Sequence, residues 1–245
     1  MACDSAEERV PLNLKAAVES ASAARYERIA AVGGTAETVA QMVDHAKAIN
    51  SERVVLVGPD IASDEKETVS AVFAAAAVAG VIAGNTDPSV PINGAELTLF
   101  GAAGKRLSDN EIDQLVRGGV TPIETVGGVS SPVRGITTKT SSGGAADTTW
   151  RELTTILIVD EVIPTIRTSL RARFARSKNT AQSRGAIRSQ VVLELEEMKS
   201  REIVDSYGEV KVSALKSDPT VCLVEFSFTV AHGLNRIYLT AHITV

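Results

Sequence analysis

Arg53-Val-Val-Leu-Val57 is an apolar, β-branched run that Gly58-Pro59 brings to an end. Polar and apolar residues do not alternate in it, which is the pattern of a strand buried on both faces of a sheet. A second short apolar run, residues 28–32, comes before it and ends at Gly33-Gly34. Between the two runs, apolar and threonine side chains recur at helical spacing, namely Thr38, Val39, Met42, Val43 and Ala46. Strand, helix and strand in this order predict a parallel sheet with helices covering both faces.

The rest of the first 143 residues continues this alternation. We expect helices over 12–24, from an N-cap at Thr35 through Ala46, from a cap at Ser63 or Asp64 to about Gly80, and over 108–117, where Ser108-Asp-Asn-Glu111 is a capping box. Further strands are expected over 96–100, 120–126 and 133–140, with a loop over 85–95. Residues 1–143 are therefore predicted to form an α/β domain with a doubly wound, mostly parallel sheet, and residues 141–147 to form a flexible linker.

The pattern changes after the linker. We expect a strand over 151–159, a helix from there to about Arg176 with Pro164 in its first turn, and a second helix after residues 177–180. Ile187, Val191, Leu195 and Met198 share one face of that second helix. Strands are expected over 209–216 and 221–230. Residues 144–245 are predicted to form an α+β domain that ends in an exposed strand.

The last ten residues alternate polar and apolar side chains up to the end of the sequence. One face would carry Ile237, Leu239, Ala241, Ile243 and Val245, and the other would carry Arg236, Tyr238, Thr240, His242 and Thr244. Strict alternation predicts a half-buried strand. Terminal residues fray unless something holds them, so this strand must pair within its own sheet or with another chain. We predict that it pairs with another chain.

The most biased segment lies between residues 167 and 188. Its basic residues, with no acidic residue among them, are Arg167, Arg171, Arg173, Arg176, Lys178, Arg184 and Arg188. One interpretation is a basic helix face that the following Glu194, Glu196 and Glu197 neutralise, and another is a docking surface for an acidic protein. A nucleic-acid surface would need interleaved aromatic residues for base stacking, and Phe174 alone is present.

Few other classes of function find support. The net charge is −5, with the deficit in the first part, which disfavours nucleic acid as a partner. Neither the two cysteines nor the three histidines have metal-ligand spacing, and we expect no catalytic site, metal or cofactor. The longest apolar run, residues 69–84, is too short to span a bilayer. The alternative to a non-enzymatic assembly protein is a small α/β nucleotide-binding protein or enzyme that uses Gly33-Gly34-Thr35 to hold a phosphate. That turn lacks the rest of a dinucleotide or P-loop motif and equally suits a tight turn from strand to helix.

A series of motifs in order resembles the tail sheath protein family of contractile phage tails and R-type bacteriocins. These motifs are Asn85-Thr-Asp-Pro-Ser-Val-Pro91, Leu107-Ser-Asp-Asn-Glu111 with Leu115-Val-Arg-Gly-Gly-Val120, Val133-Arg-Gly-Ile-Thr-Thr138, Ile158-Val-Asp160, Ile166-Arg167-Thr-Ser-Leu170 and Tyr207-Gly208. The likeness covers roughly residues 30–245. Sheath proteins usually carry a further N-terminal region with a donated arm, so we expect either a shortened chain or a compact member of the family.

The resemblance implies a structural subunit that polymerises around a tail tube by exchanging terminal strands, and that contracts to drive the tube through a cell envelope. Implied partners are other sheath subunits, the tail tube protein, and the baseplate and terminator proteins. The implied location is the virion tail, assembled in the host bacterial cytoplasm. By the same analogy, the basic residues between 167 and 188 would contact the tube or a neighbouring sheath subunit.

Overall fold

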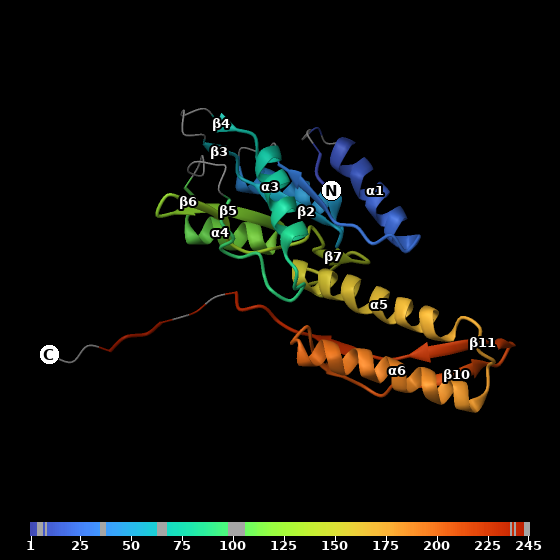
Figure 1. Cartoon of the computed structure of the whole chain (residues 1–245). Coiled ribbons are helices and arrows are strands. Elements are labelled where there is room, and N and C mark those ends of the chain that lie inside the picture. The colour runs from blue at the N-terminus through green and yellow to red at the C-terminus, as the bar shows by residue number, and fades with distance from the viewer. Residues whose placement is uncertain are drawn as a thin grey trace. The chain divides into compact units, whose positions relative to one another are not determined.

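The structure is a computed structural model that describes residues 1–3, 7, 9–34, 38–62, 68–97, 106–235, 237 and 239–242 (Figure 1). The chain divides into two compact units. Unit 1 comprises Met1–Thr86, Val90–Thr154 and Gly233–Val245, and unit 2 comprises Asp87–Ser89 and Thr155–His232. The predicted domain boundary between residues 143 and 144 stays a prediction.

Unit 1 contains a four-stranded mixed sheet in the order β1-β2-β5-β6. Its strands are β1 (Ala30–Gly33), β2 (Val54–Gly58), β5 (Val120–Val126) and β6 (Val129–Pro132). β1, β2 and β5 run parallel, whereas β6 returns antiparallel beside β5. The predicted strands near 28–32, 53–57 and 120–126 are therefore confirmed, and the first two are buried along their whole length.

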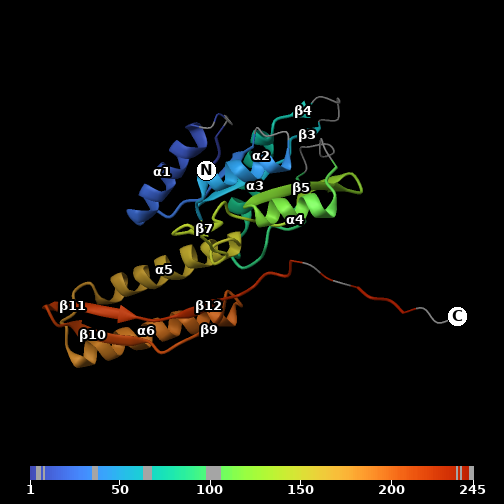
Figure 2. The same ribbon diagram turned by 180° about the vertical axis from the view of Figure 1, so that it is seen from behind.

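Helices lie on both faces of this sheet. They are α1 (Arg9–Ala23), α2 (Val39–Ile49), α3 (Ala71–Gly84) and α4 (Asp109–Arg117). Side chains of α1, α2 and α4, including Val18, Met42 and Leu115, form one core with Val32 and Leu56 of the sheet. The opposite view shows α2 and α4 in front of the sheet, with α3 behind it (Figure 2). Alternate residues of one strand thus face different helices, which is why these strands are apolar throughout.

Helix starts differ from the prediction in two places. Thr38, rather than Thr35, caps α2 in a capping box with Gln41, and Thr35 lies outside the described residues. Ser70 caps α3, so the helix does not begin at Ser63 or Asp64. Those two residues also lie outside the described residues. The short antiparallel strands β3 (Ile61–Ala62) and β4 (Thr68–Val69) occupy this part of the chain instead. The Ser108–Glu111 capping box of α4 is confirmed.

The predicted strand over 133–140 is wrong. Gly127 and Gly128, both with positive φ, form a tight turn that places β6 earlier in the chain. The following segment is held by backbone and side-chain hydrogen bonds. The N–H groups of Thr137 and Thr138 donate at 2.9 Å to the carbonyls of Arg151 and Val54. Thr121 Oγ1 accepts from the N–H of Ile136 and donates to its carbonyl, both at 2.9 Å. Buried Thr138 in turn accepts from the N–H of Ser51 and donates to its carbonyl, each at 3.0 Å.

The segment predicted as a flexible linker, residues 141–147, contains the small hairpin β7 (Ser141–Ser142) and β8 (Ala145–Ala146). The side chain of Asn50 ties this hairpin to the end of α2, because its amide donates to the Ser141 carbonyl and accepts from the Ser141 N–H, both at 3.2 Å. Residues 96 and 97, where another strand was expected, have no strand assignment. The remainder of that expected strand, 98–100, lies outside the described residues.

Unit 2 combines a helical hairpin with two pairs of strands. Its elements are α5 (Leu153–Phe174, whose first two residues belong to unit 1), α6 (Ala181–Ser200), β9 (Val204–Tyr207), β10 (Lys211–Leu215), β11 (Asp218–Glu225) and β12 (Phe228–Val230). The predicted strand over 151–159 is wrong, because helix α5 already covers it. Ile158, Val162 and Ile166 recur every fourth residue and pack with Val191 and Leu195 of α6. Since α5 begins earlier than predicted, Pro164 lies in its interior rather than in its first turn.

Candidate assembly surfaces

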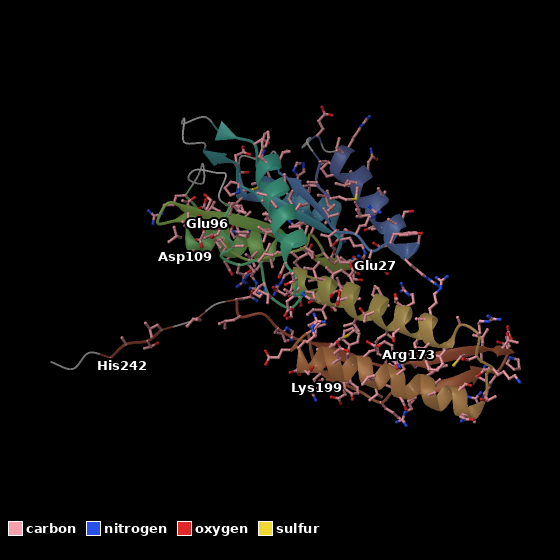
Figure 3. All side chains as sticks on the ribbon, in the orientation of Figure 1. Glu27, Glu96, Asp109, Arg173, Lys199 and His242 are labelled. Carbon is pink, nitrogen blue, oxygen red and sulfur yellow. The ribbon has the colours of Figure 1, made fainter. Side chains whose placement is uncertain are left out.

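The C-terminal segment leaves unit 2 at the end of β12. The N–H of Ala231 donates to the Ile203 carbonyl at 3.2 Å, and Asn235 then accepts a hydrogen bond from Asn93. Beyond it, Ile237 and residues 239–242, the part of the end that the structure describes, belong to no helix or strand. Figure 3 labels His242 in this segment. The predicted terminal strand therefore does not form inside the single chain at these residues.

Apolar side chains along this segment face solvent. Leu234 is 71% exposed, Ile237 is 77% exposed and Leu239 is 91% exposed. Leaving a leucine or isoleucine in water forgoes about 1.5–3 kcal/mol relative to full burial. Such a series suits a segment that is buried in another setting.

Two strand pairs in unit 2 have open edges. β10 pairs with β11 and β12 pairs with β9, each as a two-stranded antiparallel sheet. Within the described residues, each of these strands therefore pairs with another strand along one edge only, and such an edge can accept a further strand. The edge of β11 is partly occupied, because the Asn179 amide donates to the Pro219 and Val221 carbonyls. One face of these strands packs on the core of unit 2 through Val212, Val224, Phe226, Phe228 and Val230. Alternation along residues 222–230 predicts this for the last four. Exposed Val221 and Leu223 alternate with them on the outer face.

Six of the seven basic residues fall into two groups, and the seventh, Arg167, lies partly buried in α5. Arg171, Arg173, Arg176 and Lys178 are exposed at the end of α5 and in the turn after it; Figure 3 labels Arg173. In the described part of the chain, none of these four forms an ion pair. We call these four residues the basic tip. Cations here also complement the negative end of the α5 dipole.

Arg184 and Arg188 instead stabilise unit 2. Arg184 Nη1 donates to Asn179 Oδ1 at 3.0 Å, and the Asn179 amide donates to the Pro219 carbonyl of β11 at 2.7 Å. Arg188 Nε donates to the Val210 carbonyl at 3.0 Å. The predicted contact series 167–188 is thus not one continuous free surface.

Of Glu194, Glu196 and Glu197, which the sequence offers as partners for the arginines, the first two form hydrogen bonds with other residues. Glu194 accepts from Ser169 at 2.6 Å and from Gln190 at 2.7 Å. Glu196 accepts from the Tyr207 hydroxyl, and this hydrogen bond raises the pKa of Tyr207 above its ordinary value. Neither glutamate forms an ion pair with the basic tip among the described residues.

The glycine turn considered for phosphate binding has a packing explanation. A Cβ atom on Gly33 would meet the backbone of α3, and the N–H of Gly34 donates to the Val57 carbonyl at 3.0 Å. The cavity beside Gly33 is lined by Pro11, Leu12, His45, Ala48, Ile49 and Leu56, a mostly apolar set that offers a phosphate no lysine or arginine. Thr35 lies outside the described residues.

The described residues contain no cluster of three His, Cys, Asp or Glu side chains that could hold a metal ion. None of their helices combines the length and the apolar character that crossing a membrane requires.

Sequence reasoning missed the contact between Asn93 and Asn235, because nothing in the local pattern relates residues so far apart. It also missed β9, whose short run 204–207 follows directly on α6. The alternation over 221–230 was the available signal that β11 and β12 have one packed face and one free face.

Known proteins resemble this chain in sequence. Residues 145–244 match the phage tail sheath C-terminal domain. The tail sheath protein of Bacillus phage SP01 is 29% identical over 216 residues, which is 86% of this chain. The chain spans only 37% of the length of that relative.

Solved structures share the fold. The sheath tail protein of Desulfitobacterium hafniense superposes with a TM-score of 0.73 at 13% identity, over 94% of this chain and 55% of that one. The helical sheath of the anti-feeding prophage in its contracted state gives a TM-score of 0.61 at 14% identity, over 98% of this chain and 76% of that one. The match over residues 145–244 and the sequence relative confirm the resemblance to phage tail sheath proteins that the motifs of this chain predict.

Proposed function

We propose that this chain is a structural, non-enzymatic subunit of a contractile tail sheath. It polymerises around a tail tube by donating residues 236–245 as a strand to a neighbouring subunit, and the lattice contracts to drive the tube through a cell envelope. Its partners are other copies of itself, the tail tube protein, and the baseplate and terminator proteins, with no nucleic acid and no insertion into a membrane. It acts in the virion tail and is assembled in the host bacterial cytoplasm.

The observation that carries this proposal is the exposed apolar end of the chain. Ile237 and Leu239 alternate with polar residues in a segment that has no strand partner among the described residues. A donated strand of residues 236–245 would extend over roughly 33 Å. Each main-chain hydrogen bond to the acceptor would contribute about 0.5–1.5 kcal/mol, and apolar burial would add about 25 cal/mol per Å².

The open edges of unit 2 supply the acceptor. β9–β12 and β10–β11 present backbone groups to which an antiparallel or parallel strand can add. Exposed Val221 and Leu223 offer apolar contacts on the outer face of β11. A lattice whose subunits are joined by donated strands can rearrange between two packings without dissociating, and contraction requires such a rearrangement.

The basic tip is assigned to the tube or to a neighbouring sheath subunit. Its four exposed cations, Arg171, Arg173, Arg176 and Lys178, suit an acidic protein surface. The sequence predicts such a contact for the whole series from Arg167 to Arg188. The tip is preferred because Arg184 and Arg188 are hydrogen-bonded within unit 2.

Deleting residues 236–245 tests the proposal. We expect the truncated chain to keep its circular dichroism spectrum and cooperative unfolding, and to form no tubes in electron micrographs under conditions in which the complete chain polymerises. Tubes of normal length and diameter from the truncated chain would refute strand donation.

A further inference from the structure

The Asn93 side chain links three segments of unit 1. Its Nδ2 donates to Asn235 Oδ1 at 2.8 Å, and its Oδ1 accepts from the N–H of Gly135 at 3.2 Å. Asn235 is the last described residue before position 236, where the proposed donor strand begins. One amide therefore connects the base of the C-terminal segment to the loop over 91–97 and to the chain after β6.

The direction of this amide follows from its partners. A backbone N–H can only donate, so the Gly135 contact requires Asn93 to present its oxygen there. The Asn93 NH₂ group then points to Asn235, which must present its own oxygen. Both hydrogen bonds are consistent with one orientation of Asn93, and the amide satisfies a donor and an acceptor at once.

Asn93 sits on a rigid support. Its neighbour Ile92 is only 3% exposed, and a Cβ atom on Gly135 would lie 2.9 Å from Ile92 Cγ1. The N–H groups of Gly94 and Leu97 donate at 2.9 Å to the carbonyls of Pro132 and Ser130 in β6. The loop that carries Asn93 is thereby bound along the antiparallel edge strand of the sheet.

A second contact lies two residues before Asn235. Gly233 faces Pro91, and a Cβ atom on Gly233 would lie 2.9 Å from Pro91 Cγ and 3.0 Å from Pro91 Cδ. Such an approach requires glycine, because either ring or chain would have to move for a larger residue. Gly233 and Asn235 thus meet two alternate positions of the same loop, Pro91 and Asn93.

We propose that Asn93 is a latch that fastens the base of the C-terminal segment to unit 1. With the latch closed, the free segment starts at residue 236, reaches roughly 33 Å and moves with unit 1. With the latch open, the segment starts after Ala231, whose N–H is bound to Ile203 in unit 2. Residues 232–235 would then add about 13 Å of reach, and the segment would move with unit 2.

This inference rests on the proposed function for what the segment does, since reach and attachment matter to a strand that is lent to a neighbour. The effective concentration of a tethered strand at its acceptor depends on tether length. If the latch opens when subunits rearrange, the tether becomes longer by residues 232–235, and the donated strand can stay bound to its acceptor. The fastening itself concerns the single chain and can be measured there.

The test uses paired substitutions at the two amides. Asn235→Asp keeps an oxygen acceptor opposite the Asn93 NH₂ group, and Asn93→Asp keeps an acceptor for Gly135 while Asn235 rotates to donate. Each single variant should leave the latch closed. The double variant places two carboxylates against each other at neutral pH, where like charges repel, and should open it.

Distances between spin labels report the latch in the unassembled chain. Labels on Asp109→Cys in α4 and on exposed Leu234→Cys, with Cys3→Ala and Cys222→Ala, should give one narrow distance distribution for the parent and for both single variants. The double variant should give a broad distribution, and so should Gly233→Ala, which acts at Pro91 instead. A narrow distribution in both of these variants, or a broad one in the parent, would overturn the latch. Failure of the chain to polymerise would count against the proposed function and leave this measurement unaffected.

Discussion

Gly33 of β1 lies against the backbone of Val72 in α3. A Cβ atom on Gly33 would be 2.2 Å from the Val72 nitrogen and 2.6 Å from its Cα, closer than any side-chain carbon is found. The helix therefore approaches the strand as closely as a glycine allows, and this packing by itself explains why the position requires a glycine.

Replacing Gly33 with alanine should destabilise the protein. Overpacking costs about 1–3 kcal/mol and sometimes more, and here the clash is with backbone that cannot rotate away. Chemical denaturation should show the loss. The matched control is Gly34→Ala, whose added Cβ would meet its nearest neighbour at 3.7 Å and should change the free energy of unfolding by less than about 1 kcal/mol. Heat on titration with ATP, GTP or NAD, abolished by both variants, would support the phosphate-binding alternative instead.

Thr138→Val should lower the free energy of unfolding by about 1–3 kcal/mol, because it leaves the buried Ser51 N–H without its acceptor. Valine has nearly the same shape, so the loss isolates the hydroxyl group. The same substitution at Thr140 is the control, since that residue is held through its backbone: its N–H donates to Asn50 Oδ1 at 3.1 Å and its carbonyl accepts from the Asp147 N–H at 3.0 Å. Equal effects at both positions would mean that the stability of the segment over 133–140 does not depend on the Thr138 hydroxyl.

Leu239→Asp should block polymerisation without unfolding the subunit. Leu239 is 91% exposed in the single chain, so its replacement should change stability by no more than about 0.5 kcal/mol. In a donated strand, the aspartate would enter an apolar pocket and lose its hydration. Thr240→Asp lies on the opposite face of the same strand and should polymerise far better in sedimentation assays. Equal polymerisation of the two variants would argue against a one-sided strand.

Charge reversal of the basic tip should weaken binding to an acidic partner. Arg173→Glu with Lys178→Glu should reduce co-sedimentation of the chain with tail tubes, most strongly at low ionic strength, because salt screens exposed charges. The folded subunit should be affected little, with a cost at the α5 terminus of about 0.3–1 kcal/mol. Undiminished tube binding at low salt would remove the tip from the tube interface.

Tyr207 should titrate above the ordinary tyrosine pKa of about 10, because its hydroxyl donates to the Glu196 carboxylate and the nearby negative charge opposes ionisation. Folding raises this pKa, so the associated stabilisation is complete below about pH 10 and is lost as the pH rises through the folded value. Ultraviolet difference titration against Tyr207→Phe should reveal the delayed phenol. Glu196→Gln should bring that transition to lower pH, and an unchanged transition would exclude the carboxylate as its cause.

The two halves of the chain were predicted with unequal success for a physical reason. In the first, strands β1, β2 and β5 and helix α4 were predictable because each carries a local signal, a continuous apolar run or a capping box. In α5, the β-branched start from Ile156 to Val159 favoured a strand, yet contacts of Ile158 and Val162 with α6 favour a helix. Tertiary packing overrode local preference there.

The candidate surfaces show the same division. Alternation over 236–245 predicts a strand, and it remains a prediction because residues 237 and 239–242, the part that the structure describes, belong to no strand in the single chain. The structure narrows the basic series by showing Arg184 and Arg188 bound to Asn179 and Val210, contacts that no spacing rule anticipates.

By itself, then, the order of apolar and polar residues determined the kinds of element, the parallel arrangement of β1, β2 and β5 and the relationship to sheath proteins, since these depend on periodicity and on short motifs. Only the folded chain decided that scattered backbone and side-chain hydrogen bonds, rather than a strand ladder, hold residues 133–140. It also decided that Arg184 and Arg188 are hydrogen-bonded and that Asn93 meets Asn235. Each of these depends on groups that are distant along the chain and become neighbours only when the backbone has folded around its cores.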